Sequence, residues 1–208
     1  MKYFPLSLLG LACLPLLSAC TAQYVASTWQ NSMESVGLRE SHQLSREAEW
    51  GISRSSHIAL HSLSHAAFHS DVPRSAMEFN RQFLQSFQQV FPHTSIIDAT
   101  SGHSLAMRHA AINGCDILLV PKLIGIENNL NTWDELHEGP HQHPGMERGR
   151  DLAQMHILIY EVQTGRLIDR VALTSRGAYL KNGDVIPLDL FSAALQIAAR
   201  SLGRMPNT

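Results

Sequence analysis

Cysteine and surplus charge are both scarce in this 208-residue sequence, and each scarcity excludes a class of protein. Lys and Arg number 16 and Asp and Glu 18, for a formal charge of −2, so the chain lacks the basic surplus typical of nucleic-acid-binding proteins. Three cysteines occur, and two of them lie at or before residue 20. Cys115 therefore has no partner for an intrachain disulfide, and its apolar surroundings predict a buried, inert thiol.

A long apolar segment is also lacking, because the N-terminal run from Leu6 to Leu17 is too short, and too broken by Pro15, for a spanning helix. Lys2 before this run and the small residues after it are typical of a secretory signal. Leu17-Ser18-Ala19-Cys20 resembles a bacterial lipoprotein box. We therefore expect a signal peptide at 1–19, transfer of a diacylglycerol to the Cys20 thiol, cleavage before Cys20, and acylation of the new amine by a fatty acid such as palmitate.

The predicted lipid anchor indicates which membrane holds the protein. Several acyl chains anchor a protein stably, whereas one chain alone is marginal. Thr21 follows the cysteine in place of the Asp that retains lipoproteins in the inner membrane, which favours the outer membrane. We expect a bilayer-anchored protein whose domain faces the periplasm. The polar, Ser-rich residues 20–52 are predicted to be the lipidated cysteine and its tether, and residues 53–208 a single domain.

Apolar periodicity in the domain predicts five strands and three helices. The pattern begins with a strand near 56–61. It continues with a helix from a capping box at Ser75 and Glu78 to the stop at Pro92, and a strand at 95–99. A helix at 102–112 ends at Asn113-Gly114, and the strand at 117–120 is apolar on both faces. The remaining elements are strands at 154–162 and 167–174 and a helix that opens at Pro187.

The order of these elements defines the fold class. Two strand–helix–strand units in succession imply parallel strands joined by right-handed crossovers. The short turn at 163–166 favours an antiparallel hairpin. We therefore predict an α/β domain with a mixed sheet of about five strands in the order β-α-β-α-β-β-β-α.

The segment 127–151 stands out because it is long and has no periodicity. Loops of this length inside compact domains are usually functional, and contact residues concentrate on loops that a rigid sheet carries. We predict that Trp133, Asp134, Glu135 and His137 bind a partner in the cell envelope, and we expect that partner to be a protein. Arg176 is a further predicted contact residue. No nucleic acid is expected as a partner.

Two chemical alternatives come from the same segment. His137-Glu138-Gly139-Pro140-His141 matches the zinc-protease spacing, but Gly and Pro would break the helix that this motif needs. A loop site formed by His137, His141 and His143 for zinc or another transition metal is the first alternative.

The second alternative is an envelope hydrolase that uses Glu135 or Glu138 with another carboxylate. The sequence has no Gly-x-Ser-x-Gly elbow and no phosphate-binding glycine loop. We therefore expect a binding protein that is not an enzyme and needs no cofactor.

Several of these segments together resemble one family. They are the lipoprotein box, Phe91-Pro92, Ile117 to Val120, Asn131 to Glu135, Leu167-Ile168-Asp169 and Ser175-Arg176-Gly177. From about residue 55 the chain is similar to the Gram-negative lipoproteins grouped as domain of unknown function 4823. This resemblance implies no activity. The element order is also similar to the amino-terminal domain of TolB, the curli secretion lipoprotein and the lipoprotein activators of penicillin-binding proteins, at the level of fold only.

Overall fold

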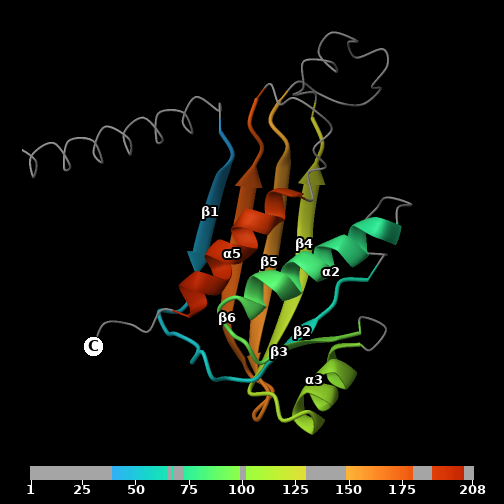
Figure 1. Ribbon diagram of the computed structural model, residues 1–208, viewed down its shortest axis with the longest axis vertical. Helices are drawn as coiled ribbons and strands as arrows, with labels where there is room; N and C mark the ends of the chain where they lie inside the picture. Colours follow the sequence, from blue (N-terminus) through green and yellow to red (C-terminus); the bar gives the residue numbers. More distant parts are fainter. Residues whose placement is uncertain are drawn as a thin grey trace, which may run out of the picture.

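A computed structural model describes residues 39–64, 67, 73–98, 102–129, 149–179 and 189–203 (Figure 1). These residues form one mixed α/β domain, as predicted. Its strands are β1 (Ser41–Arg46), β2 (Ile58–His61), β3 (Thr94–Ile97), β4 (Ile117–Glu127), β5 (Leu152–Glu161) and β6 (Leu167–Arg176). Its helices are α2 (Pro73–Gln88), α3 (His103–Ile112) and α5 (Leu190–Leu202).

The six strands make a single sheet in the order β1-β6-β5-β4-β2-β3. Strand β2 pairs in parallel with both β3 and β4, which confirms the parallel strands expected from the two strand–helix–strand units. Strands β5 and β6 pair antiparallel around a turn in which Gly165 has a φ of 67°, which confirms the predicted hairpin. Gly114, after α3, has a φ of 66°, the left-handed conformation predicted for that helix end.

Strand β1 was not among the predicted strands. It pairs with β6 over six residues, from Ser41 opposite Arg176 to Arg46 opposite Val171. Ile52, a few residues later, is buried in the core at 3% exposure. Residues 41–52 therefore belong to the sheet and the core, although the sequence placed them in the tether at 20–52. The strand is at the sheet edge and contains one large apolar residue, Leu44, so it gives no alternating pattern.

The main core lies between one face of the sheet and helices α2 and α5, which Figure 1 shows crossing that face. Phenylalanines recur every fourth residue along α2 and just beyond its end, which puts them on one side of the helix. The ring centres of Phe83 and Phe87 lie 5.0 Å apart in an edge-to-face contact, and those of Phe79 and Phe191 of α5 lie 5.8 Å apart. The helix begins at Pro73, so Ser75 lies inside its first turn. Ser75 is therefore not the residue before the helix, as the predicted capping box requires, and Glu78 bonds to Arg81 and Gln82.

Among the described helices, α3 alone packs on the opposite face of the sheet. Helix α3 packs there on β3 and the start of β4, around a smaller apolar cluster. Ile117 and Leu119 point into the main core and Leu118 into this smaller cluster, so the start of β4 is buried on both faces, as predicted. Farther along the chain, β4 extends past the last residue that pairs with β2.

Candidate functional site

Most of the predicted contact residues lie outside the described part of the chain. This applies to Trp133, Asp134, Glu135 and His137, to the proposed metal ligands His141 and His143, and to the lipidation site Cys20. The structure describes the two ends of their segment, up to Asn129 and again from Gly149. The described residues on either side of 130–148 therefore define the candidate site.

Arg176 is the one predicted contact residue that the structure describes. It is the last residue of β6 and is exposed. The strand register places it in one row with Ser41 of β1, Leu152 of β5 and Glu127 of β4. Arg176 therefore lies at the sheet end from which residues 130–148 leave and to which they return.

Arg150 ties three chain segments together at this end. Its Nε donates to the carbonyl oxygen of Gly177 at 2.6 Å, and its Nη2 donates to the Arg39 carbonyl oxygen at 3.0 Å and to Ser41 Oγ at 3.1 Å. The guanidinium also lies 6.0 Å from the centre of the Tyr179 ring, within range of a cation–π contact. The chain that enters β1 is thus held against the chain that leaves β6.

Asp151 completes this arrangement from a buried position, at 2% exposure. Its Oδ1 accepts a hydrogen bond from the Asn129 amide at 2.9 Å, and its carbonyl oxygen accepts one from the Gly177 amide at 2.8 Å. A Cβ at Gly177 would come within 3.3 Å of Asp151 Cβ, so glycine allows this close approach. We call Asn129, Arg150, Asp151 and Gly177 the loop-end network. Sequence reasoning missed it, and the adjacent Arg150-Asp151 before a strand was the only local signal.

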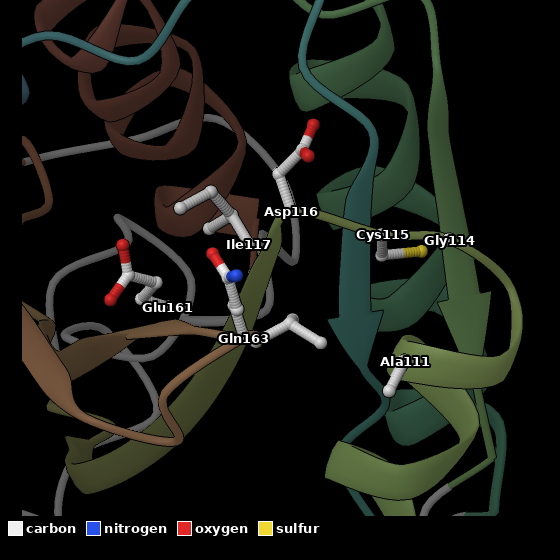
Figure 2. A pocket seen from close by; sticks show the side chains of 8 residues that line it. Ala111, Gly114, Cys115, Asp116, Ile117, Glu161 and Gln163 are labelled. Carbon is white, nitrogen blue, oxygen red and sulfur yellow. The ribbon is translucent and has the colours of Figure 1, made fainter.

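A pocket of about 420 Å³ opens at the other end of β5 (Figure 2). Its lining includes the Cys115 thiol, two carboxylates and Gln163. Asp116 Oδ2 accepts the His57 amide at 2.8 Å, and Glu161 Oε2 accepts the Thr164 hydroxyl at 2.6 Å. Figure 2 shows Cys115 and Glu161 on opposite sides of the pocket. These groups do not converge on one point, as catalytic or metal-binding groups would.

Cys115 itself is partly buried, and burial raises the pKa of its thiol. The nearby Asp116 charge adds to this rise, whereas a hydrogen bond with Ser95 opposes it. A raised pKa keeps the thiol protonated and weakly nucleophilic at neutral pH. This agrees with the inert thiol that the sequence predicted, although the side chain also reaches the pocket wall.

A serine–histidine pair lies between β1 and β6. His42 Nδ1 is 3.0 Å from Ser175 Oγ, and His42 Nε2 is 3.9 Å from a carboxylate oxygen of Glu40. Ser175 has no exposed surface, so its hydroxyl cannot meet a substrate. The pair is therefore a structural contact between two strands. Within the described ranges, no three His, Cys, Asp or Glu side chains lie close enough together to hold a metal ion.

A family model matches residues 53–202, which is most of the chain. The chain belongs to the family called domain of unknown function 4823, or DUF4823. The match begins after β1, so the first strand of this DUF4823 protein lies outside it. No curated protein sequence matches the chain. None of the helices among the described residues is long and apolar enough to cross a membrane.

Solved structures share the fold of this DUF4823 protein at low identity. A PelC dodecamer from Paraburkholderia phytofirmans is 9% identical, covers 80% of this chain and 100% of its own, and superposes with a TM-score of 0.55. A single-residue variant of that dodecamer is 10% identical, covers 77% and 98%, and has a TM-score of 0.53. These proteins differ from the three envelope proteins to which the element order is similar. At this identity the likeness shows the fold alone.

Proposed function

We propose that this DUF4823 protein is a lipoprotein of the outer membrane whose periplasmic domain binds another envelope component and catalyses no reaction. The anchor rests on Leu17-Ser18-Ala19-Cys20. The binding role rests on one observation, which is that Arg176 and both ends of the predicted contact segment are fixed together at one end of the sheet. A rigid frame of this kind lowers the entropy cost of presenting a loop to a partner.

The anchor is tested by Cys20→Ser in the full chain. We expect the wild-type protein in the outer-membrane fraction, with acyl chains on Cys20 by mass spectrometry, and the variant in the soluble periplasmic fraction. Acyl chains contribute about 0.8 kcal/mol per buried CH₂, so their loss removes the main membrane affinity. An unmodified Cys20 in a membrane-free wild-type protein would contradict the anchor.

The binding role is tested by photo-crosslinking in cells. A crosslinking amino acid is placed at Trp133 or Arg176, and at Gln163 as a control on the opposite end of the hairpin. We expect one envelope protein to be captured from positions 133 and 176 and not from 163. Capture of the same protein from all three positions, or from none, would contradict a binding site at this sheet end. Because the two PelC structures are dodecamers, a second copy of this chain is one partner to score.

The metal alternative makes a separate prediction. A protein that uses His137, His141 and His143 for zinc should retain near-stoichiometric metal through dialysis, and the triple His→Ala variant should lose it. Under the proposed function neither protein retains metal, and crosslinking from position 176 survives the triple substitution. The elemental analysis uses the domain from residue 21 without an affinity His-tag.

A further inference from the structure

Strand β1 is the last strand on one side of the sheet, and the described residues place no further strand beyond it (Figure 1). Native proteins usually protect such an edge from pairing with another chain by lysine or proline, by a bulge, or by a short length. Strand β1 has six residues, none of them lysine or proline, and its register with β6 has no shift. The edge is therefore regular enough to pair with a further strand.

The backbone groups of β1 alternate between its two sides. The Glu47 amide donates to the Arg170 carbonyl oxygen at 3.3 Å, which continues the register of β1 with β6 by one residue. In an antiparallel pair of strands, every second pair of opposite residues exchanges hydrogen bonds. The odd-numbered residues from 41 to 47 therefore bond to β6, and the even-numbered residues turn their amide and carbonyl groups to the other side. A strand that adds to β1 must pair with these even-numbered residues.

The sequence around β1 is complementary to itself in the antiparallel direction. Residues 39–47 read Arg-Glu-Ser-His-Gln-Leu-Ser-Arg-Glu. When two copies pair about Gln43, Arg39 of one copy lies opposite Glu47 of the other, and this happens twice in the dimer. Both residues are exposed, so their opposite charges meet without burial. The same register places even-numbered residues opposite even-numbered residues, as the alternation along β1 requires.

Helix α5, which covers part of β1, leaves room for this pairing. Arg46 Nη1 donates to the Ser201 carbonyl oxygen at 3.2 Å, so the end of α5 lies near Arg46. In the antiparallel dimer, Arg46 of the second copy lies opposite Glu40 of the first. The six residues between positions 40 and 46 separate the two helix ends by about 20 Å at roughly 3.3 Å per residue. Packed helices need only about 8–10 Å between their axes, so the two helix ends do not collide.

We infer that two copies of this chain pair through their β1 edges, about a two-fold axis at Gln43, and form one continuous antiparallel sheet. An unrelated strand would gain the same backbone hydrogen bonds, but the opposite charges at both ends of the segment favour a second copy. Glu47 also contacts Arg170 of its own copy at 3.4 Å, and a carboxylate has acceptor sites for both arginines. The inference goes beyond the proposed function and holds whether or not an envelope partner is captured.

The first test is disulfide formation by the full chain in producing cells. Gln43→Cys and Ser45→Cys are each made in a Cys115→Ser background, and both positions are exposed on the same face of β1. Gln43 faces its counterpart in a pair without hydrogen bonds, where Cα atoms lie about 4.5 Å apart, within disulfide range. Ser45 lies four residues along the strand from its counterpart, or roughly 13 Å, which is outside that range.

Mild oxidation should link the Gln43→Cys chain into dimers well above the level of its Cys115→Ser parent. The Ser45→Cys chain should stay at the parent level, because its thiols are too far apart. Equal linkage at positions 43 and 45, or no linkage at position 43, would overturn the pairing.

The second test reverses the charges. Arg39→Glu leaves only acidic residues at the facing positions 39 and 47, and Glu47→Arg leaves only basic ones, so each variant should repel itself. Mixing the two variants restores opposite charges in both pairs. Arg39 holds Arg150 through its backbone carbonyl oxygen, so its substitution keeps that bond.

Sedimentation of the full chain in detergent measures the result. We expect the dissociation constant of each variant alone to rise roughly tenfold or more, and that of the mixture to return near the wild-type value. Melting temperatures close to the wild-type value show that both variants are folded. A wild-type chain that stays monomeric, or a mixture that associates no more tightly than the single variants, would overturn the inference.

Discussion

Asp169 and Arg46 show how much of this fold depends on a single buried pair. The Asp169 side chain has no exposed surface, and its oxygens accept hydrogen bonds from Arg46 Nε at 3.0 Å and Nη2 at 2.7 Å and from the Ala48 amide at 3.1 Å. Arg46 also donates to the carbonyl oxygens of Trp50 at 2.6 Å and Ser201 at 3.2 Å. One pair therefore joins β1, β6 and the end of α5.

We predict that Asp169→Ala destabilises the domain by about 3–5 kcal/mol, because it leaves the buried Arg46 charge without its carboxylate partner. The control is Glu47→Ala, which removes a pair with Arg170 in which the two side chains are 61% and 42% exposed. Exposed pairs contribute about 0–1 kcal/mol, so this change should have little effect. Urea unfolding followed by far-UV circular dichroism measures both, and similar small losses in the two variants would contradict the prediction.

Cys115 gives a prediction that depends on pH. Because burial raises its folded-state pKa, the folded chain favours the protonated thiol. The stability that the protonated Cys115 thiol contributes is complete below the unfolded-state pKa of about 8.5. It is lost as the pH rises through the folded-state pKa. We expect iodoacetamide to modify native Cys115 more slowly than a cysteine peptide at pH 8, with a midpoint at higher pH. Equal rates for the protein and the peptide would contradict the raised pKa, and Cys115→Ser is the control for the stability measurement.

Strand β1 decides where the folded unit begins. It covers the edge of β6, and Trp50 and Ile52 after it pack on the main core. We predict that a chain starting at residue 53 is several kcal/mol less stable than one starting at residue 39, since it lacks Arg46 and this apolar burial. It should also aggregate more readily because the edge of β6 becomes free. Urea midpoints and light scattering of the two proteins provide the measurement, and equal midpoints would show that β1 is dispensable.

The elements that sequence predicted share one property, which is a strong local pattern. The four α2-region phenylalanines, the alternation along β5 and the apolar start of β4 each carry their periodicity within a few residues. Strand β1 carries none, because most of its side chains are polar and its place is set by pairing with β6. The loop-end network was missed for the same reason, since the Arg150 bonds to Arg39 and Ser41 span 111 and 109 residues. The position of Arg176 at the end of β6 could be predicted because it ends a hairpin with a strong local pattern.

At the scale of the whole molecule, the two apolar clusters are unequal and share β4. The main cluster contains five fully buried phenylalanines and lies under two helices. In the smaller one, three of the six buried members are the alanines Ala59, Ala106 and Ala110. Helix α3 buries only Ala106 and Ala110 and leaves Leu105 and Ile112 exposed at 47% and 74%. Apolar burial contributes roughly 25 cal/mol per Å², so α3 is held much less strongly than α2 or α5.

We therefore predict that stability is distributed unevenly, and that α3 opens without unfolding of the rest of the sheet. Regions with little apolar burial open at free energies below the global value. In native-state hydrogen exchange, amides of α3 should exchange through an opening that low denaturant hardly affects, while amides of β5 and β6 exchange only through global unfolding. Ala110→Gly should speed exchange in α3 and leave β5 and β6 nearly unchanged, because glycine costs about 1 kcal/mol in a helix interior. A common free energy of exchange for α3 and β5 would show instead that β4 couples the two clusters into one cooperative unit.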